Sequence, residues 1–250
     1  MSKKIVLHTQ YSYLQTFISR LPEIFLFEGE YIHDGRNKIK VFEVEGLKIN
    51  VKRYRIPLLI NRFAYLYLRQ TKAERAYEYA LQLQVKGINT PTPIAYIIEK
   101  NKGLLAYSYF ISLHVPYPRR FYEFGNSPLT EANKIIFQEF GKYTAQLHEK
   151  GIYHQDYSPG NILFDLKNDK PEFCIIDINR MHFGPVSLKK GCANFTRLWG
   201  PPEMFRIIAQ AYAQTRGMDI NTVCTEILTA RQHYWKKAIR KRPAEFPLEF

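Results

Sequence analysis

This sequence has few cysteines, no long apolar run and few acidic residues, and each shortage excludes a class of protein. Its three cysteines, at positions 174, 192 and 224, are scattered and lack metal-site spacing, which excludes a disulfide framework and fits a reducing compartment. The longest apolar stretch, near 104–115, is too short and too polar to span a bilayer. The apolar run at 5–7 is too short for a secretory signal peptide, so we expect a cytoplasmic protein.

The scarcity of acidic residues leaves a formal net charge of +13, from 36 Lys and Arg against 23 Asp and Glu. A basic surface attracts nucleic acid, an anionic membrane or a phosphorylated substrate. The 250 residues are 46% hydrophobic and 15% aromatic, which is enough to bury a large core. No repeat or low-complexity linker interrupts them, so we expect one domain over 1–250.

The most informative stretch is His154-Gln155-Asp156-Tyr157-Ser158-Pro159-Gly160-Asn161. Asp156 precedes Asn161 by five residues, and Asp177 closes the second of two short apolar strands that follow. This order is typical of the catalytic loop and metal-binding strand of kinase-like phosphotransferases. A polar turn followed by an ordinary hairpin is the alternative interpretation.

The chemistry of phosphoryl transfer explains why these residue types are needed. The reaction requires positioning of the reactants and neutralisation of phosphate charge. We predict that Asp156 accepts the proton of the attacking hydroxyl. Magnesium is a hard cation that takes carboxylate, amide and phosphate oxygens, so Asn161 and Asp177 are the predicted Mg²⁺ ligands.

A phosphate-binding lysine is predicted upstream, on the strand 47–54, where apolar and polar residues alternate. Lys52 follows Val51 as such a lysine would, although a strand lysine that only faces solvent is the alternative. A helix is expected next, from about Leu58 to Val85, and it carries Glu74 and Glu78 on one face. Glu78, nearer the apolar stripe, is the preferred partner of Lys52, and Glu74 is its rival.

Further along, 94–98 and 104–113 read as two strands joined by a turn, and they lead to a proline-bearing hinge near 116–118. A helix is expected to start at Ser127-Pro128, with serine as its cap, and to end before Gly151. Its buried stripe is expected to contain Ile136, Phe140, Tyr143 and Leu147. The predicted fold is therefore α+β and two-lobed, like a protein kinase. A small β-rich N-lobe with one main helix and the hinge occupy 1–115, and a larger, mostly α-helical C-lobe occupies 116–250.

Several segments of the chain resemble the lipopolysaccharide kinase family, bacterial relatives of protein kinases that phosphorylate Kdo or heptose sugars of the lipopolysaccharide inner core. These segments are 50–52, 71–80, 87–93, 154–161 and 176–180. The resemblance implies ATP and Mg²⁺ as cosubstrates. It also implies a cytoplasmic site of action that faces the bacterial inner membrane.

The sequence departs from protein kinases in four places. The expected nucleotide-covering hairpin has no G-x-G-x-x-G motif, only Asp34-Gly35 and the basic residues Arg36 and Lys38. Arg36 or Lys38 is a candidate for the phosphate contact in its place, and an ordinary basic turn is the favoured alternative. Gln155 and Ile178-Asn179 replace the usual arginine and Phe-Gly, and no Ala-Pro-Glu signal follows. A protein substrate gated by an activation loop is therefore not expected.

The positive charge peaks in the segment 231–242, which contains no acidic residue. Lys236, Lys237, Arg240 and Lys241 form i,i+4 pairs, while Trp235 lies on another side of the expected helix. This pattern fits a helix lying on an anionic membrane. A solvated basic helix that packs on the large lobe through its aromatic residues fits equally well.

Three classes of function remain. The preferred one is an ATP-dependent kinase that phosphorylates a sugar hydroxyl of the lipopolysaccharide inner core and contacts the inner membrane peripherally. The second is a small atypical protein serine/threonine kinase or an aminoglycoside-type kinase. The third, an inactive kinase-fold binding protein, is disfavoured because Lys52, Asp156, Asn161 and Asp177 are all present. Nucleic acid is not an expected partner.

Overall fold

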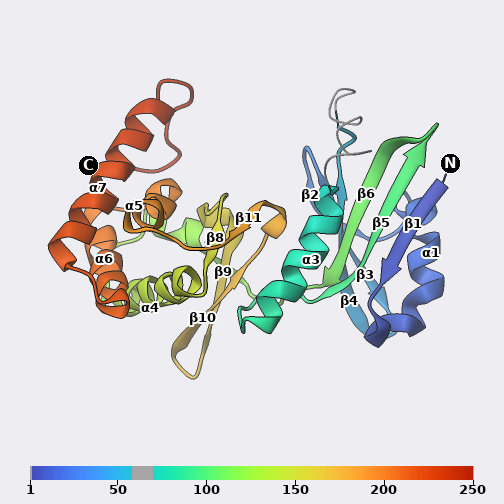
Figure 1. Ribbon diagram of the computed structural model, residues 1–250, viewed down its shortest axis with the longest axis horizontal. Coiled ribbons are helices and arrows are strands. Elements are labelled where there is room, and N and C mark those ends of the chain that lie inside the picture. The colour runs from blue at the N-terminus through green and yellow to red at the C-terminus, as the bar shows by residue number, and fades with distance from the viewer. Residues whose placement is uncertain (1, 58–69, 250) are drawn as a thin grey trace. The chain divides into compact units, whose positions relative to one another are not determined.

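The strand and helix patterns of the sequence produce two units, Met1–Pro116 and Tyr117–Phe250 (Figure 1). The structure is a computed structural model and describes residues 2–57 and 70–249. Each unit builds its own core. That the two units act as one domain stays a prediction.

Unit 1 is built on a six-stranded antiparallel sheet with the order β1-β5-β6-β4-β3-β2. Its strands are β1 (Ser2–Leu7), β2 (Glu30–Asp34), β3 (Lys38–Val44), β4 (Leu47–Tyr54), β5 (Pro93–Asn101) and β6 (Leu104–Leu113). Successive side chains of a strand face opposite sides of a sheet. In β4, Ile49 and Val51 are buried in the core on one face, so Lys52 faces the other. The strands expected in this half are confirmed.

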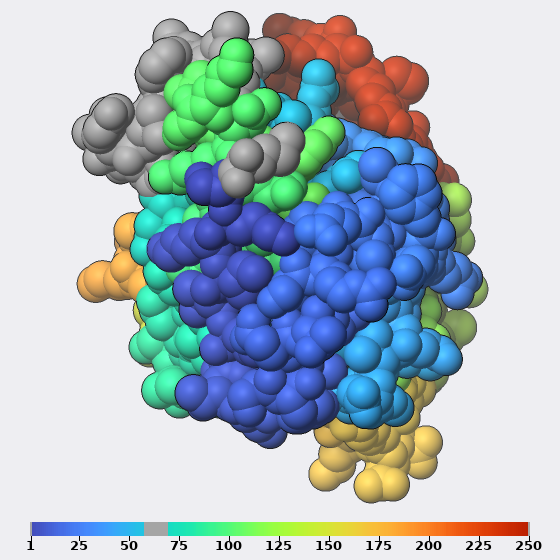
Figure 2. Space-filling view, turned by 90° about the vertical axis from the view of Figure 1, so that its right-hand side faces the viewer, coloured from blue at the N-terminus to red at the C-terminus, as the bar shows by residue number. Residues whose placement is uncertain are grey.

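One face of this sheet is covered by α1 (Gln15–Ile24), which follows the short 3-10 helix η1 (Thr9–Leu14). The apolar residues of this segment recur at helical spacing and are buried in the same core as Val51: Leu14, Ile18, Leu21 and Phe25. The N-terminal segment, in dark blue, forms much of the unit 1 surface seen in Figure 2. α1 thus adds a second helix to the one expected from the sequence.

The opposite face of the sheet is covered by α3 (Lys72–Val85) (Figure 1). Thr71 caps its first turn in a capping box, in which the hydroxyl accepts from the backbone N–H of Glu74 and the carboxylate accepts from the N–H of Thr71. The helix begins there, later than the expected start at Leu58, and residues 58–69 lie outside the described part of the chain. It ends at Val85, and Gly87 shortly after it, with a φ of 67°, provides the left-handed turn that glycine tolerates.

Unit 2 is mainly helical. Its longer helices are α4 (Glu131–Glu149), α6 (Pro202–Arg216) and α7 (Ile220–Ala238), accompanied by α5 (Leu188–Ala193). Short strands complete it: β7 (Arg119–Arg120), β8 (Ile152–His154), β9 (Ile162–Lys167), β10 (Lys170–Ile175) and β11 (Met181–Phe183). Aromatic rings fill the core between α4 and the β9–β10 hairpin, notably Phe121, Phe124, Phe140, Phe164 and Phe173. The segment 162–175, which lies between Asp156 and Asp177 in the sequence, is therefore a packed hairpin.

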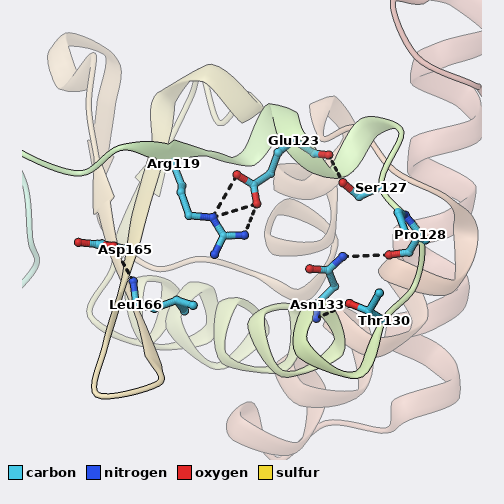
Figure 3. Close-up of polar contacts among 8 residues, drawn as sticks. All are labelled: Arg119, Glu123, Ser127, Pro128, Thr130, Asn133, Asp165 and Leu166. Carbon is cyan, nitrogen blue, oxygen red and sulfur yellow. Dashed lines mark hydrogen bonds and ion pairs between the residues drawn. The ribbon is translucent and has the colours of Figure 1, made fainter.

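The start of α4 differs from the prediction that Ser127 caps it. Thr130 is the cap, because its hydroxyl accepts from the backbone N–H of Asn133 at 3.2 Å (Figure 3). The hydroxyl of Ser127 instead donates to the carbonyl of Glu123, which closes the preceding 3-10 turn. The carboxylate of Glu123 also accepts from the guanidinium of Arg119, whose flat face lies 4.4 Å from the ring centre of Phe164.

The basic segment 231–242 is helical only as far as Ala238, where α7 ends. Its aromatic side packs inward, because Trp235 is 9% exposed and its ring centre lies 5.0 Å from that of Phe246. Arg231 is also buried and donates to the carbonyl of Gly200 at 2.7 Å. Trp235 is therefore not placed to enter a membrane, which supports the packed alternative for this side of the helix. None of the helices in residues 2–57 and 70–249 combines the length and apolarity needed to cross a membrane.

Candidate active site

The loop between β8 and β9 brings Asp156 and Asn161 together. The side-chain amide of Asn161 donates to the backbone carbonyl of Asp156 at 2.8 Å. The backbone N–H of Ser158 donates to the same carbonyl at 2.8 Å, and the N–H of Asn161 donates to the carbonyl of Ser158 at 2.9 Å. These bonds fold the five-residue spacing into a tight turn, so the two side chains have a fixed relation to one another.

His154 joins this loop to the strand that leads to Asp177. Its Nε2 bonds to the carbonyl of Ile176 at 3.0 Å, and its Nδ1 accepts from the backbone N–H of Asp156 at 3.0 Å. A carbonyl is only an acceptor, so this arrangement requires a neutral ring that carries its proton on Nε2. Burial lowers the pKa of His154, which favours the neutral form. The backbone N–H of Ile176 also donates to the carbonyl of Asn161, at 3.0 Å, so two bonds hold the second aspartate strand against the loop.

Asp177 lies at the end of that strand in a left-handed conformation, with φ 56° and ψ 43°. Aspartate is among the few residues that tolerate this region, and non-glycine residues held there are concentrated at functional sites. Its carboxylate accepts from the side-chain amide of Asn179 at 2.5 Å. Asn179 occupies the position of the missing glycine of the kinase triplet and instead orients the carboxylate of Asp177.

The donor set of the loop fits magnesium. Asn161 uses its amide nitrogen inside the turn, so the oxygen on the other side of the same amide is the atom suited to a hard cation. Asp177 supplies a carboxylate from the adjoining strand end. Among the described residues no group of three or more His, Cys, Asp and Glu side chains forms a cage. One carboxylate and one amide match the habit of Mg²⁺, which completes its shell with phosphate oxygens and water.

A third charged residue, Arg197, reaches this loop and was missed in the sequence analysis. Its Nη1 donates to Oδ1 of Asp156 in an ion pair. Arg197 ends the short 3-10 helix η5 (Asn194–Arg197), which follows α5. No spacing rule connects positions 156 and 197, so only the fold reveals this contact.

A buried polar network holds η5 against the loop. The side-chain amide of Asn194 donates to the carbonyl of His154 at 2.9 Å, and its oxygen accepts from Nε2 of His148 at 3.0 Å. Nδ1 of His148 then accepts from the hydroxyl of Tyr212 at 2.8 Å, and that hydroxyl accepts from Arg216 at 2.6 Å. Burial lowers the pKa of His148 to about 4, so its ring is neutral as this chain of bonds requires.

The predicted phosphate-binding lysine lies in unit 1. Lys52 is paired in register with Ile39 of β3 and Phe110 of β6, and its Nζ lies 5.4 Å from the ring centre of Tyr54. On α3, the carboxylate of Glu78 accepts from the side-chain amide of Gln70 at 2.8 and 3.0 Å. The pairing of Lys52 with Glu78 stays a prediction.

Glu74, the rival of Glu78, has other partners. Its carboxylate lies 2.9 Å from Nζ of Lys4 and accepts from the hydroxyl of Tyr96 at 3.3 Å, besides closing the capping box of α3. These contacts tie α3 to β1 and β5. Glu74 therefore stabilises unit 1 through these contacts, which do not involve Lys52.

The hairpin that replaces a glycine-rich loop is formed by β2 and β3, as expected. Lys38 forms an ion pair with Asp34 across the turn, at 2.9 Å. Asn37 accepts from the backbone N–H of Arg55 at 3.2 Å, which ties the turn to the end of β4. A contact of Arg36 or Lys38 with phosphate stays a prediction.

Solved structures place this architecture in a class. The chain superposes on WaaP in complex with acyl carrier protein with a TM-score of 0.64, at 14% identity, over 95% of this chain and 98% of that one. It superposes on the Rio2 kinase of Chaetomium thermophilum with a TM-score of 0.52, at 13% identity, over 95% of this chain and 78% of that one. The fold is therefore that of the protein-kinase-like proteins.

Within this class, residues 35–198 match the model of the lipopolysaccharide kinase (Kdo/WaaP) family, and the chain belongs to that family. The matched segment contains every predicted site residue and also Arg197. Two relatives named 3-deoxy-D-manno-octulosonic acid kinase are similar. That of Vibrio parahaemolyticus is 27% identical over 58% of this chain and 61% of its own length, and that of Mannheimia succiniciproducens is 26% identical over 52% and 53%. The chain thus spans a little over half the length of these relatives.

Proposed function

We propose that this chain is an ATP-dependent kinase that phosphorylates a sugar hydroxyl of the lipopolysaccharide inner core, most simply the Kdo sugar named in its relatives. The observation that carries the proposal is the hydrogen-bonded loop that joins Asp156, Asn161 and the strand of Asp177. Family membership supports the choice of a sugar acceptor. Kdo and heptose are both inner-core sugars, and the acceptor assay below distinguishes them.

In the proposed reaction the acceptor hydroxyl attacks the γ-phosphorus of ATP. The new oxygen–phosphorus bond forms as the bond to the ADP oxygen breaks, and the hydroxyl proton passes to the carboxylate of Asp156. The turn that holds Asn161 to the carbonyl of Asp156 fixes the base before the substrate arrives. This preorganisation supports the role of Asp156 as the catalytic base.

Asn161 and Asp177 are the residues that would hold Mg²⁺, which when bound neutralises charge on the nucleotide phosphates. Asn179 keeps the carboxylate of Asp177 in place. Lys52 would bind the phosphates, and Glu78 would hold the ammonium group of Lys52 in position. These assignments rest on residue type, order along the chain and the local geometry of each unit.

We also infer a peripheral attraction to an anionic membrane surface from the exposed basic residues at the end of α7 and just after it. The four side chains that the sequence analysis singled out are exposed: Lys236, Lys237, Arg240 and Lys241. Trp235 is buried, so the attraction is electrostatic and involves no aromatic insertion. Such a contact would bring a cytoplasmic enzyme to a glycolipid acceptor on the inner face of the membrane.

The test is transfer of label from [γ-³²P]ATP in the presence of Mg²⁺. The acceptors are lipid A bearing Kdo, the same lipid extended with heptose, and a generic protein substrate. We expect label on the Kdo sugar. Label on heptose alone would make heptose, and not Kdo, the sugar acceptor. Label on protein alone would replace the proposal by the protein-kinase alternative.

Asp156→Asn is the diagnostic variant for this assay. Its turnover should fall roughly 10²- to 10⁴-fold, the usual contribution of acid–base catalysis, while ATP binding stays near that of the unmodified protein. Asp165→Asn is the matched control, because Asp165 lies on β9 and its carboxylate accepts a local bond from the N–H of Leu166, drawn in Figure 3. Normal turnover in Asp156→Asn would show that Asp156 is not the catalytic base.

A further inference from the structure

The ion pair between Arg197 and Asp156 places a cation on the proposed base. Both residues belong to unit 2, and Nη1 of Arg197 donates to Oδ1 of Asp156. The side chain of Asp156 is 22% exposed and that of Arg197 is 40% exposed. A guanidinium carries five N–H donors in a planar fork, so a single bond to Asp156 leaves donor capacity on an accessible group.

Arg197 is held in place from behind. Two residues near it in the sequence, Phe195 and Leu198, are fully buried. Phe195 packs edge-on against Tyr212 with ring centres 5.3 Å apart, and Asn194 bonds to the carbonyl of His154. The backbone of η5 is therefore rigid, while the outer end of the arginine side chain remains accessible.

The proposed reaction removes the partner of Arg197. When Asp156 accepts the hydroxyl proton, its carboxylate becomes neutral and the ion pair disappears. A guanidinium left without an anion loses its stabilisation, so this step is favoured if another anionic group takes over the arginine. An acceptor that carries an anion close to its reacting hydroxyl supplies that group.

We propose that Arg197 binds an anionic group of the acceptor sugar and so determines specificity for acidic acceptors. The inference rests on the proposed function, and it deepens it by naming the residue that recognises the acid group. A sugar carboxylate fits best, because the planar guanidinium matches a carboxylate in a bidentate geometry that a lysine cannot reproduce. In the bound state the guanidinium of Arg197 pairs with the substrate carboxylate in place of Asp156, whose carboxylate is then free to receive the proton.

The experiment compares two acceptors and three variants. One acceptor is the Kdo-bearing lipid, and the other is the same lipid with the sugar carboxyl group converted to a neutral amide, which adds no hydroxyl. Arg197→Gln removes the charge, and Arg197→Lys keeps the charge but loses the planar fork. Arg206→Gln is the matched control, since Arg206 is an exposed cation on α6 of the same unit.

We expect Arg197→Gln to lower kcat/KM for the acidic acceptor by roughly 10- to 100-fold, the scale of a lost charge-assisted bond, mainly through a higher KM. The same variant should change kcat/KM for the amide acceptor by less than about threefold. Arg197→Lys should fall between Arg197→Gln and the unmodified protein on the acidic acceptor, and Arg206→Gln should match the unmodified protein on both. The KM for ATP should stay constant throughout.

Equal losses on both acceptors would assign Arg197 a structural role and overturn the inference, as would unchanged kinetics on the acidic one. If Arg197→Gln fails to fold, Arg197→Lys still decides the question. An unaltered preference of Arg197→Lys for the acidic acceptor would exclude recognition of the carboxylate by the planar guanidinium. Failure of the unmodified protein to label either lipid overturns the proposed function and this inference with it. Labelling of both lipids with equal efficiency overturns the inference alone.

Discussion

At the scale of single residues, the site is made of side chains whose orientation is set by a neighbour. Asn179 orients Asp177, His154 orients Asp156 through its backbone N–H, and Asn161 closes on the carbonyl of Asp156. In each case the hydrogen bond engages one atom of a polar group and so fixes the direction in which the remaining polar atom of that group points. The left-handed backbone of Asp177 belongs to the same arrangement, because it lies between the end of β10 and the 3-10 turn 178–180 that carries Asn179.

Asp177→Asn therefore tests the metal assignment with little structural change. Asparagine tolerates the left-handed conformation at least as well as aspartate, but it removes the negative charge that Mg²⁺ requires. A ligand at 100 times its Kd stabilises a protein by about 2.7 kcal/mol, and this Mg-ATP-dependent gain should be largely lost in Asp177→Asn. Thermal unfolding with and without Mg-ATP measures it. Equal stabilisation of the variant and the unmodified protein would exclude Asp177 as a ligand.

Single residues also show which parts of the candidate site can be predicted from the sequence. Asp156, Asn161 and Asp177 are predicted from local spacing, because a loop and a hairpin connect them over a short stretch of chain. Arg197 is 41 positions beyond Asp156 and is brought back by η5 and its buried network, which no local pattern encodes. Contacts of this kind depend on tertiary packing, so they become visible only in the structure.

At the scale of elements, strands were easier to predict than helix ends. The strands 94–98 and 104–113 are mostly apolar segments separated by a polar turn at 99–103, and they are confirmed within β5 and β6. The cap of α4 was misplaced, because Ser127 and Thr130 are both good caps and the local sequence does not say which one bonds forward. Ser127 is occupied by the carbonyl of Glu123, so the helix starts at the next candidate.

The helix α3 provides a test that separates Glu74 from Glu78. Glu74→Gln weakens a capping box and an ion pair with Lys4, so it should lower the free energy of unfolding by about 1 kcal/mol. Glu78→Gln should lower turnover instead and should show strong kinetic coupling to Lys52→Met in a double-mutant cycle. Urea unfolding and steady-state kinetics on the same variants measure both effects. Strong coupling of Lys52 to Glu74 would reverse the assignment.

The contacts between α4, α6 and η5 predict a pH dependence of stability. His148 is buried and neutral, with its pKa lowered to about 4, whereas an unfolded histidine has a pKa near 6.5. The unfolded chain therefore binds the extra proton between these values, so stability is fully present above about pH 6.5 and is lost as the pH falls toward 4. His148 alone should remove about 2 kcal/mol between pH 7.5 and pH 5.

Urea unfolding at the two pH values measures this loss. His148→Gln removes the titrating group, so its free energy of unfolding should be lower at pH 7.5 but should depend less on pH. The pKa of His154 is also lowered by burial, so a residual dependence of the same sign should remain in that variant. An identical pH dependence in the variant and the unmodified protein would show that His148 is not the responsible group.

At the scale of the whole molecule, the excess of positive charge is the property that the fold and the site leave unexplained. A formal net charge of +13 is not needed to bind one nucleotide or one sugar. The end of α7 concentrates part of it on exposed side chains, while the same segment buries Arg231 and Trp235 in unit 2. The segment is therefore anchored by one face and presents its charge on the other.

This separation makes the membrane proposal testable without unfolding the helix. The quadruple variant replaces by Gln the exposed basic residues Lys236, Lys237, Arg240 and Lys241. Each cation near an anionic surface contributes on the order of 1 kcal/mol, and added salt weakens the attraction because the Debye length is about 8 Å at physiological ionic strength. Vesicle binding should therefore fall, and the apparent KM for glycolipid should rise, while hydrolysis of ATP by water is unchanged.

The matched control removes the same number of charges from elsewhere in unit 2, by replacing with Gln the exposed residues Lys142, Lys150, Lys170 and Lys189. Both variants then carry the same net charge, so only the position of the lost charges differs. Co-sedimentation with vesicles of phosphatidylglycerol and phosphatidylethanolamine, at low and at physiological salt, measures binding. Equal losses in the two variants would mean that total charge drives the attraction. Unchanged binding and unchanged KM in the α7 variant would leave that segment as a structural helix end whose basic residues only face solvent.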